Sequence, residues 1–316
     1  MANSVFWGLK NKPFKRLDGP QKTFYDALAN GSDLVIDMMA TSWEHGVANR
    51  ALEGKKEARS RPQFVHSQIL SAVKWTLSNV VILSVLAELL SSPGHGSPKT
   101  TIYDGNLPPV WRYLKGCLIS SLTALAIVGG IRGSLDMTAA MLVSLGSSPQ
   151  KWPPFFFSPW RSTSVSSFWG YRWHQVVRVT YMHVGGKPLA AITGSGRLGL
   201  VMGTFIATGI AHEAGTMRVP AARAKEGQGA LLFFTMMGVG VVLEDIWTKI
   251  TGRKVRGVFG WFWTMGWLTL WGNQYVDRSL RIGMLEIFPM KYIPGNARPS
   301  KMLWEFLVNG HTPQFS

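Results

Sequence analysis

Residues 198–215 read LGLVMGTFIATGIAHEAG, an apolar run that carries a histidine and a glutamate near its end. Such a run predicts a helix embedded in a membrane. Residues four apart lie one above another on a helix, so small residues at this spacing form a stripe. Its members are Gly199, Gly203, Ala207, Ala211 and Gly215. Because small residues let helices approach closely in lipid, the stripe predicts a close helix contact.

A polar stripe of Thr204, Thr208 and His212 runs beside the small one. An unpaired polar group that faces lipid tails is costly, because the tails form no hydrogen bond with it. We therefore expect this stripe to face the protein interior. At about 1.5 Å per residue, His212 would lie roughly 20 Å along the helix from Arg197, which we expect at the cytosolic end.

The composition suits an integral membrane protein. Of the 316 residues, 46% are hydrophobic and only 16% are charged, against about 25% in soluble domains. The net charge of +16 favours anionic partners such as phosphorylated cofactors and acidic membrane lipids. Nucleic acid is not expected, because apolar runs separate the basic clusters and no nucleic-acid-binding motif is present. Cys117 is the only cysteine, which excludes a disulfide scaffold.

The apolar runs predict an all-α, polytopic membrane protein with about six to eight transmembrane or re-entrant helices. The expected spans are residues 69–90, 113–131, 198–215, 230–247 and 258–271. Residues 137–145 are too short to cross alone, and we expect a separate re-entrant or interfacial helix there.

The N-terminal region differs from the rest of the chain. Residues 1–62 have mixed charge and lack the apolar core of a signal peptide, so we expect a cytosolic or interfacial segment. Basic residues precede the first long apolar run, which favours a cytosolic N-terminus. They are Lys55, Lys56, Arg59 and Arg61. Residues 63–316 would then form one membrane-embedded domain, with the motifs in residues 150–215.

Three familiar motifs are incomplete or out of place. Residues 194–199 match G-x-G-x-x-G, but no strand precedes them, so a dinucleotide site is not expected. His212 and Glu213 lack the second histidine of a zinc protease helix, and we expect no metal. The chain also lacks a G-x-S-x-G nucleophile elbow.

Residues 147–197 contain six basic residues and no Asp or Glu, with aromatic residues between them. Within this loop, residues 168–174 read FWGYRWH, here called the aromatic box. By itself the box is more typical of an aromatic belt at the membrane interface than of a site. An ionisable pair such as His212 and Glu213 inside an apolar helix is a functional candidate by default. The structural alternative is a histidine hydrogen-bonded to a neighbouring helix.

Together these two elements resemble a known family. FWGYRWHQ at residues 168–175, followed by GIAHEAG at residues 209–215, is similar to the wax synthase-like branch of the membrane-bound O-acyltransferases. It is most similar to acetyltransferases of fungal secondary-metabolite clusters. The resemblance implies a helical enzyme of the endoplasmic reticulum that transfers an acyl group from acyl-CoA, with acetyl-CoA favoured, to a lipophilic alcohol. It implies no bound cofactor, and Tyr171 departs from the pattern because relatives often carry an arginine there.

The resemblance implies that His212 is the catalytic histidine and that His174 is the second active-site position. His212 would take the proton of the acceptor hydroxyl, which attacks the thioester directly because no nucleophilic cysteine or serine elbow is present. His174 would position a substrate or donate to the oxyanion. The expected substrate or CoA contacts are Trp169, Arg172, Trp173, Arg178, Thr208 and Glu213. Arg161 and Lys187 add positive charge for the CoA phosphates.

Two alternatives stay open. A membrane transporter or lipid-binding scaffold would use the buried histidine as a proton relay or a packing residue, without turnover. An isoprenoid cyclase on a similar helical fold would depend on Glu213, Glu244 and Asp245 and would need no CoA. The acyl chain length, the acceptor and the oligomeric state are not readable from the motifs.

Overall fold

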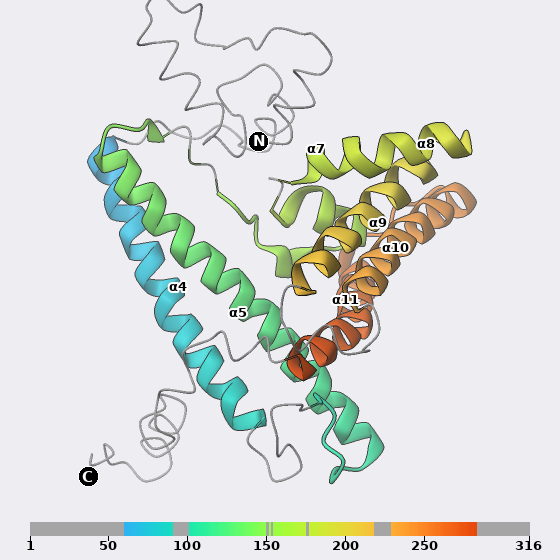
Figure 1. Ribbon diagram of the computed structural model, residues 1–316, viewed down its shortest axis with the longest axis horizontal. Coiled ribbons are helices and arrows are strands. Elements are labelled where there is room, and N and C mark those ends of the chain that lie inside the picture. The colour runs from blue at the N-terminus through green and yellow to red at the C-terminus, as the bar shows by residue number, and fades with distance from the viewer. Residues whose placement is uncertain are drawn as a thin grey trace, which may run out of the picture. The chain divides into compact units, whose positions relative to one another are not determined.

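The computed structural model describes residues 60–90, 101–149, 152, 154–174, 177–217 and 229–282. Within these ranges the chain is helical and contains no strand (Figure 1). The prediction of an all-α fold is therefore confirmed. Almost all of the expected N-terminal segment, residues 1–62, lies outside the described residues, so its cytosolic or interfacial placement stays a prediction.

Five long helices carry the architecture of the described residues. They are α4 (Arg61–Leu90), α5 (Pro109–Ser144), α9 (Gly196–Thr216), α10 (Gly229–Thr251) and α11 (Gly257–Arg281). Short segments precede α9: η4 (Pro159–Arg161), α6 (Val165–Ser167), η5 (Phe168–Arg172), α7 (Arg178–Tyr181), η6 (Met182–Gly186) and α8 (Lys187–Thr193). Of the described helices, α4, α5 and α10 are long and apolar enough to cross a membrane by length and composition. Each of these three matches an expected span, whereas the total number of spans stays a prediction.

The expectation of a separate helix at residues 137–145 is wrong, because α5 continues without a break to Ser144. The polar residues that precede this stretch have partners within the helix pair. Arg132 Nε donates to Asp136 Oδ2 at 3.0 Å, one turn along the same helix. Ser71 Oγ of α4 donates to the same oxygen at 2.6 Å. These contacts satisfy the charges within the helix pair and fit a continuous helix through this region.

The helices α4 and α5 run antiparallel and side by side (Figure 1). Glycines of α5 permit this close approach. A Cβ added at Gly133 would lie 3.1 Å from Thr76 Oγ1, and one added at Gly129 would lie 3.2 Å from Asn79 Oδ1. Small residues at a helix contact are the usual means of close packing in lipid.

Contacts between Cα atoms divide the chain into two compact units, and the long helices contribute to both. Of the described residues, unit 1 contains those up to Ile69, those of Met137–Thr208 and those of Met237–Thr264. Unit 2 contains the described residues of Leu70–Asp136 and Gly209–Met236 and those from Met265 onward. The aromatic box therefore belongs to unit 1 and His212 belongs to unit 2.

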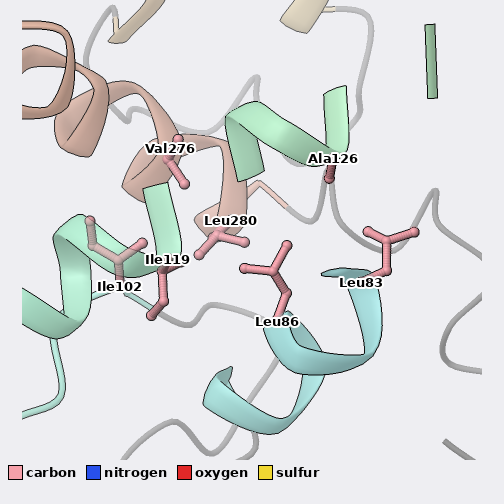
Figure 2. Packing of buried hydrophobic residues seen from close by; sticks show 7 residues of the cluster. All are labelled: Leu83, Leu86, Ile102, Ile119, Ala126, Val276 and Leu280. Carbon is pink, nitrogen blue, oxygen red and sulfur yellow. The ribbon is translucent and has the colours of Figure 1, made fainter. Parts of the chain in front are cut away.

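An apolar core holds α4, α5 and α11 together in unit 2 (Figure 2). Its buried members are Leu83, Leu86, Ile102, Ile119, Ala126, Val276 and Leu280. The loop before α5 is fixed to α11 by Asp277. The carboxylate oxygen Oδ1 of Asp277 accepts hydrogen bonds from Thr101 Oγ1 at 2.5 Å and from Ile102 N at 2.8 Å. This carboxylate holds Ile102 in the core, where its exposure is 0%.

In unit 1 the small stripe of α9 packs against η6 and α8. A Cβ added at Gly199 would lie 2.5 Å from Ala190 Cα, and one added at Gly203 would overlap the carbonyl oxygen of Gly185. The predicted close helix contact is confirmed for this part of the stripe. Among the described residues, a Cβ added at Gly215 would meet nothing within 4 Å, so the close contact does not extend to that glycine.

Large apolar side chains are exposed along α4 and α5. Leu77 is 62% exposed, Trp111 is 64% exposed and Leu118 is 48% exposed. Exposed apolar surface on helices of this length and composition fits contact with lipid tails.

Candidate active site

His212 lies in unit 2, near the C-terminal end of α9, and is half-buried. Its ring packs against Phe234 of α10, with ring centroids 4.4 Å apart and planes at 41°. Phe234 is 5% exposed, so an apolar ring covers this side of the imidazole. The neighbouring Phe233 stacks on Tyr275 of α11 at 5.5 Å and 17°. Residues of α10 and α11 thus form the surroundings of this end of α9.

Glu213, the residue after His212, is 5% exposed and connects the same three helices. The carboxylate oxygen Oε1 lies 2.8 Å from Nη2 of Arg278 in α11. The other oxygen, Oε2, accepts from the backbone N–H of Ala230 at 3.1 Å and of Leu231 at 3.4 Å. These N–H groups belong to the first turn of α10, where an anion is favoured. The carboxylate therefore has partners within the protein, and its contact with a substrate stays a prediction.

The threonines of the polar stripe bond to the backbone of their own helix. Thr204 Oγ1 donates to Leu200 O at 2.6 Å, and Thr208 Oγ1 donates to Thr204 O at 2.8 Å. Threonine satisfies its hydroxyl in this way within membrane helices. Because these hydroxyls have partners, the cost of an unpaired polar group no longer requires the polar stripe to face the protein interior. The expected contact of Thr208 with a substrate stays a prediction.

The aromatic box of unit 1 begins with a π-helical turn, η5. Its backbone bond spans five residues, because Trp173 N donates to Phe168 O at 2.8 Å. Turns of this width are rare and are often found at functional sites. A second π-helical turn, η6, follows in the same loop.

The rings of the box pack on one another and on the preceding aromatic residues. Phe168 stacks on Trp173 at 5.3 Å and 21°, and Phe156 meets Trp173 at 5.0 Å with its ring at 70°. Trp169 contacts Phe205 of α9, with ring centroids 5.9 Å apart. Phe156 is 4% exposed and Phe168 is 8% exposed. This buried cluster favours a packed site over a belt of separate rings at a membrane interface.

His174 closes the box at the edge of this cluster and is half-buried. Its ring centroid lies 5.4 Å from that of Phe155, 5.9 Å from that of Phe156 and 5.6 Å from that of Trp173. Aromatic neighbours keep water away from the imidazole, and a hydrogen bond to a ligand is stronger in such surroundings. The catalytic role of His174 stays a prediction.

Arg172 connects the box to the stretch before it. Its Nη1 donates to the carbonyl oxygens of Phe157 at 2.9 Å and Ser158 at 3.3 Å. Tyr171, the residue that departs from the family pattern, stacks on Phe157 at 5.0 Å and 22°. Ser158 has a φ of 51° in the left-handed region, so these contacts hold a strained turn. Contact of Arg172 with CoA stays a prediction.

Glu244 of α10 anchors the start of the box and is 6% exposed. Its Oε1 accepts from Val165 N at 2.6 Å and from Trp263 Nε1 at 2.9 Å, and its Oε2 accepts from Ser166 N at 2.9 Å. Because α6 runs directly into η5, this carboxylate decides where the box begins. From the sequence, Glu244 has a role only in the cyclase alternative. The sequence feature that could have identified Glu244 as an anchor is its position as an acidic residue inside an apolar run.

Exposed basic residues lie in the loop that contains the box. Arg161, Arg178 and Lys187 are all exposed. Lys187 Nζ lies 2.8 Å from His183 Nε2, one helical turn away. These cations offer positive charge to an anionic ligand, while their contact with CoA phosphates stays a prediction.

The segment that contains the aromatic box and His212 is similar to a known protein family. Residues 152–236 match the Membrane bound O-acyl transferase family. The resemblance expected from the sequence is thereby confirmed. The matched segment contains the aromatic box and the helix with His212, and every residue predicted for the site falls within it. The roles of the individual residues stay predictions.

Curated relatives carry names of the same kind. The chain is 26% identical to an O-mevalon transferase of Penicillium terrestre, over 63% of this chain and 48% of that protein. It is 26% identical to an acetyltransferase of Calcarisporium arbuscula, over 42% of this chain and 35% of that protein. It is 24% identical to an O-mevalon transferase of Aspergillus niger, over 81% of this chain and 63% of that protein. The chain thus spans half or less of the length of the first two relatives, and no solved structure matches it.

Proposed function

We propose that this chain is an acyl-CoA-dependent O-acyltransferase of a cellular membrane that acylates a lipophilic alcohol of secondary metabolism. The observation that carries the proposal is the family match over residues 152–236, which includes both His174 and His212. Relatives named acetyltransferases and O-mevalon transferases support acyl transfer to oxygen. The apolar helices α4, α5 and α10 support a membrane location, for which we propose the endoplasmic reticulum.

In this reaction His212 is the general base. Its imidazole accepts the proton of the acceptor hydroxyl while the oxygen attacks the carbonyl carbon of the thioester. The tetrahedral intermediate then collapses, the C–S bond breaks, and the proton passes from His212 to the CoA sulfur. The products are the ester and free CoA. The Phe234 ring against His212 supports this role, because apolar surroundings limit competition from water.

The transferred acyl group has two candidates. Acetyl is the first, because several relatives are named acetyltransferases. A mevalon group is the second, because the relatives with that name align with 63% and 81% of this chain. The exposed cations Arg161, Arg178 and Lys187 would bind the CoA phosphates in either case.

The arrangement of carboxylates does not support the cyclase alternative. Glu213 is paired with Arg278, and Glu244 holds the start of the box. Asp245 forms a two-pronged contact with Arg197, with Nε to Oδ2 at 2.6 Å and Nη2 to Oδ1 at 2.8 Å. Carboxylates that are occupied by partners in the protein are poorly placed to protonate a hydrocarbon.

The direct test uses membranes from cells that express the chain, radiolabelled acetyl-CoA and a panel of lipophilic alcohols such as farnesol and 1-dodecanol. We expect label in the extracted ester and release of free CoA, whereas a transporter or scaffold would release none above control membranes. Repeating the panel with a mevalonyl thioester separates the two acyl groups. Mass spectrometry of metabolites with and without the gene would then identify the natural acceptor.

His212→Ala tests the general base, with His66→Ala as the matched control because His66 is exposed on α4. We expect His212→Ala to lower turnover by about 100-fold or more at unchanged abundance, since a general base contributes about 10²- to 10⁴-fold. His66→Ala should keep wild-type turnover. Wild-type turnover in His212→Ala would overturn the assignment.

A further inference from the structure

Two hydrogen-bond donors of unit 2 have no role in the site predicted from the sequence. They are Nη1 of Arg278 and the hydroxyl of Tyr275, which lie one turn apart on the same face of α11. The Arg278 Nη1 atom is buried and has no acceptor among the residues that the structure describes. A buried donor without an acceptor is costly, and so it points to a ligand that supplies one.

The guanidinium of Arg278 is held in place at one edge, through its Nη2 atom. Its Nη2 lies 2.8 Å from Oε1 of Glu213, the residue next to His212, and its side chain is 11% exposed. The aliphatic part packs against the first residue of α10, because a Cβ added at Gly229 would lie 2.8 Å from Arg278 Cδ. A guanidinium fixed in this way presents its other edge in a defined direction, with little loss of freedom when a ligand binds.

Tyr275 shares an aromatic neighbour with His212. The Phe234 centroid lies 4.4 Å from the His212 ring and 6.4 Å from the Tyr275 ring. Phe233 stacks on Tyr275 at 5.5 Å and 17°, which fixes the plane of the phenol. The two donors and the imidazole therefore belong to one neighbourhood of unit 2.

We infer that the Tyr275 hydroxyl and Arg278 Nη1 donate hydrogen bonds to the acyl oxygen of the thioester. This inference rests on the proposed acyl transfer and supplies donors that the sequence left unidentified. When the acceptor oxygen forms its bond to the carbonyl carbon, the π electron pair of the carbonyl moves to the acyl oxygen. The two donors stabilise this negative charge until the C–S bond breaks and the carbonyl forms again. Neither donor transfers its proton.

The first test measures binding and needs no acceptor alcohol. The probe is the trifluoromethyl ketone analogue of acetyl-CoA, whose hydrated carbonyl mimics the tetrahedral intermediate, and the full-length protein is purified in detergent. Tyr275→Phe removes only the hydroxyl. We expect it to weaken binding of the analogue at least tenfold while binding of free CoA stays within twofold. Equal affinity of wild type and Tyr275→Phe for the analogue, or no binding of the analogue to the wild type, would overturn the inference.

The matched control is Tyr113→Phe, the same change at a tyrosine of unit 2 that is 42% exposed on α5. It should bind the analogue as the wild type does. Arg278→Lys keeps a positive charge beside Glu213 but removes the second guanidinium edge, and we expect the same selective loss of the analogue. A loss of CoA and analogue binding in equal proportion would assign these residues to packing instead.

Turnover gives the second readout. Loss of one oxyanion donor lowers kcat about 10²- to 10³-fold, and we expect this in Tyr275→Phe with KM for acetyl-CoA within about threefold. Wild-type kcat in Tyr275→Phe would overturn this inference and leave the proposed function intact. Wild-type turnover in His212→Ala would instead remove the proposed mechanism, so the two failures are distinguishable.

Discussion

Arg278→Met would leave the Glu213 carboxylate buried without its counter-charge. The two side chains are 11% and 6% exposed, so water cannot solvate the remaining charge well. Breaking a buried ion pair from one side costs about 3–5 kcal/mol. At roughly 2–4 °C per kcal/mol for chains of this size class, the unfolding midpoint should fall by about 6 °C or more. The midpoint is measured by tryptophan fluorescence of the full-length protein in detergent.

A matched control lies one turn along the same helix. Arg281 Nε is 2.8 Å from Asp277 Oδ2, and the two side chains are 42% and 12% exposed. Because Asp277 keeps its hydrogen bonds from Thr101 and Ile102 when Arg281 is replaced, and water reaches the exposed arginine, this pair should contribute less than the buried one. Arg281→Met should therefore shift the midpoint by only a few degrees at most. The double variant Glu213→Gln with Arg278→Met should recover part of the loss, because no buried charge is left. Equal losses in Arg278→Met and Arg281→Met would refute the reasoning.

Two further predictions concern unit 1. Glu244→Ala removes the acceptor of three N–H groups, each worth about 1–3 kcal/mol when left unsatisfied, so amide exchange at Val165 and Ser166 should accelerate and turnover should fall. Glu244→Gln keeps an acceptor and should lose less, and unchanged protection in Glu244→Ala would contradict the anchoring role. Gly203→Leu should destabilise the protein by at least about 1–3 kcal/mol through overpacking, because its side chain would meet the backbone of Gly185. Gly215→Leu, where a Cβ meets nothing within 4 Å, should have a midpoint within about 1–2 °C of wild type, and equal effects of the two changes would count against the close contact.

The sequence was informative wherever a single helix carries the signal. The small stripe of α9 predicts a close contact because its spacing matches the helical turn, and Gly199 and Gly203 do pack against the preceding segment. Prediction failed at residues 137–145, where an apolar run too short to cross a membrane alone was expected to form a separate re-entrant or interfacial helix. In the structure α5 is continuous, Arg132 and Asp136 pair along it, and Ser71 adds its hydrogen bond from another helix. Such a partner is not visible in a local window.

The sequence by itself determined that the chain is helical, apolar enough for a membrane, and similar to an acyltransferase family through the aromatic box and the histidine helix. These properties follow from local spacing and from residue types. Only the tertiary structure decided what the acidic residues do. Glu244 reaches Val165, 79 residues away in the chain, and Glu213 reaches Arg278 on another helix. Contacts of this kind depend on how helices pack, because packing brings together groups that lie far apart in the sequence.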